Sequence, residues 1–416
     1  MVRKRTHCNS PWLAAGRGAG HAEQLYLLMS AKGSGAKDMG EGFKAAIVGV
    51  GSTNFAELHQ SPAIPRTAHS LAIDAFRAAL LDSGLDKTAV DGLICVRISS
   101  YQQVAAEIGL PEVRMAYSLE GTGRMAGVAV QQAVSAIATG KAKTVAILYG
   151  NNGRSAGDKY GGKFDPHSPA AYDAMYGMTS PGAYVSMMYR RHQYEYGTPP
   201  DGLAALAINN RRNGALNEAA VFRKPISRDD YYASPFVAEP LRLLDYCMIN
   251  DGGVCLIVAA ADMARHLKHP PVHVLASATA GSFSAHYTSR DYFYSACQAV
   301  AHEIRSQSKI THRDVDCAQI YDNFTPTILF SLEGFGFCPR GASGHWVQDG
   351  RIELNGELPI NTSGGHTAEG YMQGFGLLAE SVRQIQGQAG KHQVENCELV
   401  QYICASPIVS SILFSR

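Results

Sequence analysis

The chain has 416 residues, of which 46% are hydrophobic and 18% charged, and its formal net charge is +1. This balance is typical of a globular protein with one large or two ordinary domains, and it gives no reason to expect nucleic acid or an anionic membrane as a partner. No apolar run reaches the roughly 18 residues that a spanning helix needs, so no membrane span is predicted.

The first 43 residues differ from the rest of the chain. They begin with the basic, glycine-rich stretch MVRKRTHCNSPWLAAGRGAG and continue into a segment with the composition of a linker. A transit peptide is one interpretation. We favour a disordered basic tail, or an upstream start codon with Met39 nearer the true beginning.

Alternating apolar strands and helices are predicted from residue 44 onward. The first part contains strands at KAAIVGVG, AVDGLICVRI and KTVAILYGN, a helix from Ala68 to Leu81, and a glycine-rich turn that leads into the helix of GTGRMAGVAVQQAVSAIATGKA. Residues 151–240 are instead rich in Gly, Pro, Tyr and Met, with helices expected at PGAYVSMMYRRHQYEYG and LAALAINNRRNGALN. A strand at NDGGVCLIVAA follows this excursion.

The second part repeats the order of the first. It contains strands at PVHVLASATAG, DVDCAQIYDNF, CELVQYICAS and SSILF, a helix over residues 291–306, and a glycine turn with its helix in NTSGGHTAEGYMQGFGLLAESVRQIQGQ. We interpret this as a duplicated unit with two mostly parallel sheets packed through shared helices. The two glycine turns, at residues 121–123 and 364–370, are expected to face one another across a pocket, each at a helix N-terminus.

Nine cysteines are scattered through the chain without a CxxC pair, so no zinc ribbon is predicted. The odd count, without a secretory signal, favours reduced thiols and a cytoplasmic protein. Most of these cysteines lie in apolar strand-like runs and are expected to be small core residues.

Four segments in this order resemble the thiolase superfamily, in particular its sterol-carrier and lipid-transfer branch. They are KAAIVGVGSTNF, NDGGVCLIV, YDNFTPTILFSLEGFGFC and NTSGGHTAEGYMQG, and the resemblance covers about residues 44–416. It implies a five-layered α-β-α-β-α duplication, usually a homodimer. The implied halves are residues 44–262, with an inserted loop domain at about 151–240, and residues 270–416.

Three departures from the thiolase pattern change the expected chemistry. The position of the nucleophilic cysteine falls on Gly123 or a neighbour, and no cysteine lies between Cys95 and Cys247. The histidine of the family's GHP motif falls on Tyr371, and the first residue of its HDCF or NEAF segment falls on Tyr321. A covalent thioester intermediate therefore has no sulfur on which to form.

Retro-aldol cleavage of a β-hydroxyacyl-CoA needs a base, an acid and donors for an enolate oxygen, but no nucleophile. The resemblance to steroid side-chain aldolases implies that Tyr321 and Tyr371 are the acid/base pair. It also implies a DUF35-type partner with an OB-fold and zinc ribbon, fused or bound to a hot-dog-fold hydratase. No tightly bound cofactor is expected, and coenzyme A enters as part of the substrate.

Other site candidates carry weaker signals. The turn before Tyr371 offers backbone N–H donors that could serve the enolate oxygen. His366 could orient a tyrosine or the thioester, or be a surface turn residue. Asp322 and Asn323 could position Tyr321 or, by default, cap the following helix, and Asn361 is expected to tie down its loop. The candidates for substrate or oxyanion contacts are His366, Gly365, Gly123, Asn323 and Cys404.

Two alternatives to an aldolase stay open from the sequence. One is a thiolase-type acyltransferase or condensing enzyme that uses another nucleophile. The other is a non-catalytic lipid-binding subunit, in which the tyrosines have no catalytic role.

Overall fold

The computed structural model describes residues 44–60, 66–110, 112–120, 123, 125–159, 161, 171–281 and 290–416. The predicted basic tail lies outside the described residues. Chain contacts unite the described residues in one compact unit. The division into halves at residues 262 and 270 stays a prediction.

The first half supplies five strands and two outer helices. The strands are β1 (Ala45–Ser52), β2 (Gly92–Val96), β3 (Met115–Leu119), β4 (Thr144–Asn152) and β7 (Asp251–Ala260), and α3 (Ala68–Ser83) with α4 (Tyr101–Ile108) covers one face. Helix α3 lies close to the sheet because glycines face it. A Cβ atom on Gly51 or Gly253 would lie 2.0 or 2.1 Å from a backbone oxygen of this helix.

The second half supplies four more strands, β8 (Val272–Gly281), β9 (Cys317–Ile320), β10 (Leu399–Cys404) and β11 (Ile408–Ser415). Its outer face is covered by α11 (Tyr294–Ser308) and the fully buried α12 (Thr325–Phe335). The helix predicted over residues 291–306 starts three residues later, because Tyr292 and Phe293 have positive φ angles that no α-helix accommodates.

In the described residues the two sets of strands form one sheet, in the order β3-β2-β4-β7-β1-β8-β11-β10-β9. The halves meet at β1 and β8, which pair antiparallel at Ala46–His273 and Ile47–Val272. The expectation of a mostly parallel sheet is wrong, since β1, β7, β8 and β11 all pair antiparallel with their neighbours. Strand β11 follows β10 after three residues, and so short a connection permits only antiparallel pairing.

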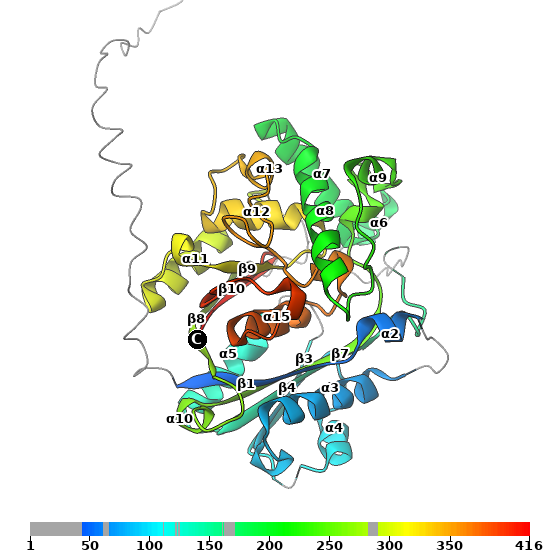
Figure 1. Ribbon diagram of the computed structural model, residues 1–416. Coiled ribbons are helices and arrows are strands. Elements are labelled where there is room, and N and C mark those ends of the chain that lie inside the picture. Colours follow the sequence, from blue (N-terminus) through cyan, green and yellow to red (C-terminus); the bar gives the residue numbers. More distant parts are fainter. Residues whose placement is uncertain are drawn as a thin grey trace, which may run out of the picture. The chain divides into compact units, whose positions relative to one another are not determined.

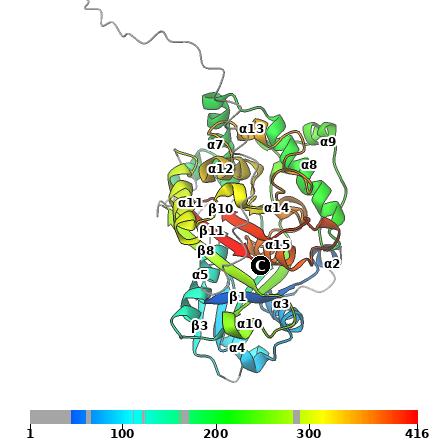
Figure 2. The ribbon, with the colours of Figure 1, turned by 60° about the vertical axis from the view of Figure 1, so that its left-hand side comes forward.

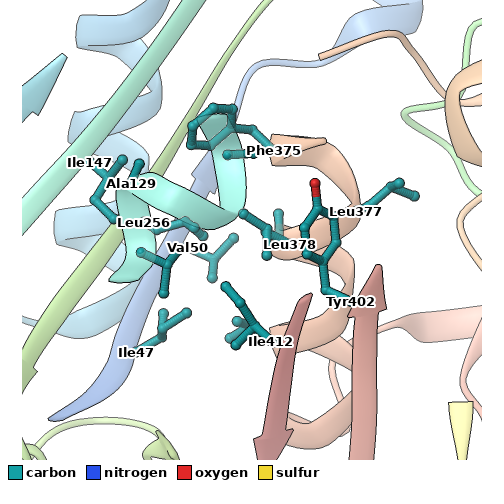
Figure 3. Close-up of a cluster of buried hydrophobic side chains, with 14 of the residues drawn as sticks. Ile47, Val50, Ala129, Ile147, Leu256, Phe375, Leu377, Leu378, Tyr402 and Ile412 are labelled. Atoms are coloured by element: carbon teal, nitrogen blue, oxygen red, sulfur yellow. The ribbon is translucent and has the colours of Figure 1, made fainter. Parts of the chain in front are cut away.

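Helices α5 (Met125–Ala138) and α15 (Phe375–Gln386) form the middle layer, between the two parts of the sheet (Figures 1 and 2). Both contact strands of both halves. Figure 3 shows part of this buried cluster, with Ala129 of α5 and Leu378 of α15 between strand residues such as Ile147 and Ile412. The layer order is therefore α-β-α-β-α, and the predicted fold class is confirmed.

The excursion between β4 and β7 is mainly helical where it is described. It contains α6 (Ala171–Met175), α7 (Pro181–Tyr196), α8 (Asp201–Leu216), α9 (Arg228–Ala233) and a small hairpin of β5 (Phe236–Ala238) and β6 (Leu241–Arg242). Both predicted helices are present, as α7 and α8. The shorter helices elsewhere are α2 (Phe55–Gln60), α10 (Ala261–Ala264), α13 (Ser343–Trp346) and α14 (Gly365–Ala368).

A buried carboxylate joins the excursion to the second half. Glu333 of α12 accepts hydrogen bonds from His192 of α7, from Ser343 and from Tyr294. Burial alone would raise the pKa of Glu333, but the bonds from His192 and from backbone and hydroxyl donors overcome it and lower this pKa to about 2. The ionised carboxylate therefore holds α7 against α12.

No helix in the described part of the chain is long and apolar enough to cross a membrane. The cysteines of the described residues are buried and form no disulfide. Burial raises the pKa of the Cys95 thiol to about 12, as expected for a small core residue.

Candidate active site

The hydroxyl groups of Tyr321 and Tyr371 lie 2.8 Å apart and share a hydrogen bond. Tyr321 follows the C-terminal end of β9 and is 3% exposed, whereas Tyr371 lies half-buried in the bend between α14 and α15. Their rings meet edge to face, with centroids 6.3 Å apart. The structure thus brings together two residues that are separated by 50 positions in sequence.

Gly123 lies directly against the Tyr321 phenol. A Cβ atom at Gly123 would be 2.0 Å from the Tyr321 hydroxyl oxygen and 2.2 Å from its ring carbon Cζ. Real contacts of this kind are never so short, so the hydroxyl group occupies space that a side chain at position 123 would need.

His366 packs against both tyrosines. Its ring is 1% exposed and meets the rings of Tyr321 and Tyr371 edge to face, at centroid distances of 4.7 and 5.2 Å. The Nε2 atom accepts a hydrogen bond from the backbone N–H of Gly374, so the ring proton of the neutral imidazole is on Nδ1. The alternative that His366 is a surface turn residue is therefore wrong.

Asp322 holds the loop that carries His366. Its carboxylate accepts the backbone N–H of His366 at 2.9 Å and lies 3.1 Å from Nδ1 of the same residue, off the line of a hydrogen bond. The expectation that Asp322 or Asn323 caps the following helix is wrong. The N-cap of α12 is Phe324, no side chain caps it, and Asp322 instead binds the first turn of α14.

The backbone donors near Tyr371 are largely engaged within the protein. The N–H groups of Glu369 and Gly370 donate to the Gly365 carbonyl, and the N–H of Tyr371 donates to Oδ1 of Asn250 at 2.7 Å. With His366 and Gly374 also engaged, the expectation that this turn supplies donors to an enolate oxygen is wrong for these groups. They hold the loop in place instead.

Helix α8 and its C-cap residue Asn217 present a row of asparagine side chains to the same loop, which we call the asparagine ladder (Asn209, Asn210, Asn213 and Asn217). All four are buried, and each amide nitrogen donates a hydrogen bond to Asp322 or to the loop of residues 360–369. Asn210 joins Asp322 to this loop, because its Nδ2 lies 2.8 Å from Oδ2 of Asp322 and 2.8 Å from Oγ1 of Thr367. The ladder and Asn250 are not among the residues predicted from the sequence, although asparagines spaced along one helical face are a signal for the ladder.

The remaining candidates lie around this centre. Gly365 has a φ of 60°, and a Cβ atom there would be 2.5 Å from the Asp322 carboxylate. The backbone carbonyl of Asn323 accepts from Cys247. Cys404 ends β10, directly after the residue whose carbonyl accepts the N–H of Tyr321, and it is fully buried. Asn361 ties its loop to β9 through both backbone groups of Ile320, as predicted.

Hydrogen-bonded phenols can pass a proton directly between them, which suits acid/base chemistry without a nucleophile. In the described part of the chain, no group of three or more acidic, histidine or cysteine side chains could hold a metal ion. A thiolase-type fold and a paired-tyrosine site in place of the thiolase cysteine together define a thiolase-like protein.

Comparison with known proteins agrees with this thiolase-like assignment. The family described as thiolase C-terminal domain-like matches residues 278–403. The steroid side-chain-cleaving aldolase of Thermomonospora curvata is 35% identical over 360 residues, covering 82% of this chain and 90% of that protein. The 17-hydroxy-3-oxo-4-pregnene-20-carboxyl-CoA lyase of Mycobacterium tuberculosis is 35% identical over 361 residues, covering 83% and 92%.

Among solved structures, the Ltp2-ChsH2(DUF35) aldolase is similar with a TM-score of 0.81 at 32% identity, covering 89% of this chain and 97% of that chain. The chain therefore belongs to the thiolase superfamily and, within it, to the family of steroid side-chain-cleaving aldolases. The resemblance inferred from the sequence is confirmed.

Proposed function

We propose that this chain is a carbon–carbon lyase that cleaves a β-hydroxyacyl-CoA by a retro-aldol reaction. The products are a ketone and a shortened acyl-CoA, and a steroid or other bulky cyclic side chain is the substrate class. The observation that carries the proposal is the 2.8 Å hydrogen bond between the Tyr321 and Tyr371 hydroxyl groups.

The paired phenols account for every proton in this reaction. One phenol oxygen, as phenolate, takes the proton of the substrate hydroxyl, and the Cα–Cβ bond breaks with its electron pair moving to the thioester as an enolate. The other phenol then gives its proton to Cα. Transfer of one proton across the hydrogen bond between the two tyrosines restores the starting state, so no solvent proton and no covalent intermediate are needed.

The surrounding contacts hold Tyr321 and Tyr371 in fixed positions relative to each other. The backbone of Tyr321 is held by the carbonyl of Ile403 and by the hydroxyl of Thr327, and that of Tyr371 by Asn250. His366 fills the space beside both rings. This packing limits the freedom of the two hydroxyl groups, which favours catalysis by fixed geometry.

The acyltransferase alternative lacks a suitable nucleophile among the described residues. Position 123 is a glycine whose side-chain space is filled by Tyr321, and the nearby Cys404 is fully buried. A silent lipid-binding subunit would not need two phenols aligned at hydrogen-bond distance.

The assembly proposed for this chain follows its relatives. The similar solved aldolase includes a DUF35 component, and we extend a partner of this type to this chain. A homodimer, a bound hot-dog-fold hydratase and a cytoplasmic location belong to the same proposal. Coenzyme A enters only as part of the substrate.

The test uses the full chain co-purified with its DUF35-type partner and the CoA thioester named for the mycobacterial relative. Tyr321→Phe and Tyr371→Phe are each expected to lower kcat by about 10²- to 10⁴-fold, the range for a lost general acid or base. Tyr149→Phe is the matched control, because this tyrosine is buried, as Tyr321 is, and its hydroxyl has no hydrogen-bond partner among the described residues. Ketone release at the wild-type rate by either site variant would refute the proposal.

A further inference from the structure

We infer that Gly123 is a positioning residue that determines which chemistry this fold can perform. Its missing side chain provides the space in which the Tyr321 hydroxyl reaches Tyr371. The inference rests on the proposed function, and it adds that a side chain at position 123 and an aligned tyrosine pair exclude one another.

The geometry places the conflict on the phenol. The φ angle of Gly123 lies outside the range of +20° to +160° that strains L side chains, so the conflict of an alanine at this position is with neighbouring atoms. The nearest atoms to an added Cβ are the hydroxyl oxygen, Cζ and Cε2 of Tyr321, at 2.0, 2.2 and 2.4 Å. All three belong to the far end of one side chain, so relief of the overlap requires that end to move.

The Tyr321 main chain cannot retreat with it. Its N–H donates to the Ile403 carbonyl at 2.8 Å in the parallel pairing of β9 and β10, and its carbonyl accepts the Thr327 hydroxyl at 2.9 Å. The ring of His366 closes another side, 4.7 Å away between centroids. The phenol must therefore swing on a fixed backbone.

The size of the shift decides the effect. Ordinary contact begins at about 3.4 Å, so the hydroxyl oxygen must move by about 1.4 Å from the 2.0 Å overlap. A functional group must be held within about 0.5 Å of its productive position, and a misplacement of about 1 Å can cost about 100-fold in rate. A shift of this size takes the hydroxyl oxygen out of the position from which it bonds Tyr371 at 2.8 Å.

One consequence concerns specificity between reactions. A cysteine at position 123 needs the same space as alanine for its Cβ atom, and more for its sulfur. A nucleophilic thiol there and the tyrosine pair cannot coexist in this site, so glycine commits the pocket to proton-transfer chemistry.

The experiment is a double-mutant cycle with G123A, Y321F and the double variant, assayed by ketone release from the same CoA thioester. G123A is expected to lower kcat about 100-fold with a smaller change in KM, and to add little further loss in the Y321F background. Gly376→Ala is the control, because a Cβ atom in that helical position meets nothing closer than 3.5 Å. G123S serves as a second variant with the same expected outcome.

Two results would overturn the inference. One is wild-type kcat in G123A, and the other is an equal, additive loss from G123A with and without the Tyr321 hydroxyl. Unfolding of both position-123 variants would also overturn it, since the conflict would then fall on the protein frame and not on the phenol. Failure of the proposed function is distinct, because it appears as full activity of Y321F alone.

Discussion

Replacement of Asn210 by alanine tests whether helix α8 sets the geometry of the tyrosine site. The side chain is fully buried, and its amide donates to Asp322 and to Thr367, at 2.8 Å each. A hydrogen bond to a charged group contributes about 1.5–3 kcal/mol and one to a neutral group about 1 kcal/mol, so their loss should lower the free energy of unfolding by about 3 kcal/mol.

Asn209→Ala is the matched control for this variant. It removes the neighbouring buried amide, which makes one bond of 3.1 Å to the Ile360 carbonyl and none to Asp322. Its expected cost is about 1 kcal/mol. Both variants remove the same side-chain atoms, so the difference between them reports the second hydrogen bond and the carboxylate partner.

The two variants should differ more in catalysis than in stability. Loss of the Asn210 amide frees Asp322, which holds His366 and through it the two phenol rings, so kcat should fall 10- to 100-fold at nearly constant KM. Asn209→Ala should keep a kcat close to that of the wild-type protein. Urea unfolding gives the free energies and steady-state ketone release gives the rates; equal kcat values for the two variants would refute this reasoning.

Three further predictions follow from other contacts. Asn250→Ala removes the acceptor of the Tyr371 N–H, so kcat should fall at least 10-fold with little change in KM, whereas a pure rise in KM would contradict this role. Iodoacetamide should leave the native enzyme active because the cysteines of the described residues are buried, and stoichiometric inactivation would argue for a thiol mechanism. The pKa of Glu333 is lowered in the folded state from 4.5 to about 2. The ionised carboxylate therefore stabilises the folded state by about 3 kcal/mol above pH 4.5, and this contribution is lost as the pH falls toward 2. Glu333→Gln should therefore lower Tm at neutral pH and flatten its decline in acid, and parallel Tm profiles would refute the linkage.

Hydrophobic periodicity predicted most of the elements, because long apolar runs such as that of β7 leave few alternatives. It missed β3, whose sequence MAYSL is short and has no β-branched residue. Strand direction was also mispredicted, since it depends on where the chain re-enters the sheet after the long excursion. The contact between β1 and β8 is another feature that no local pattern encodes.

The contacts within the site are likewise not encoded in a local sequence pattern. Resemblance pointed to Tyr321 and Tyr371, but their separation is a property of the folded chain. Asparagines on a helix usually indicate a solvent-exposed face, so the sequence does not predict that the ladder on α8 is buried. Asp322 was assigned to the nearest helix in sequence, whereas it binds one that begins more than forty residues later.

The asparagine ladder also limits how this protein can be rebuilt. Helix α8 lies in the predicted first half of the chain, yet Asn210 and its neighbours hold the loop of the predicted second half. The two halves therefore depend on each other. Neither can be replaced by the corresponding half of a relative unless helix α8 and the loop that it binds come from the same protein. Chimeras cut between β7 and β8 should fold and yet lose turnover when ladder and loop come from different parents.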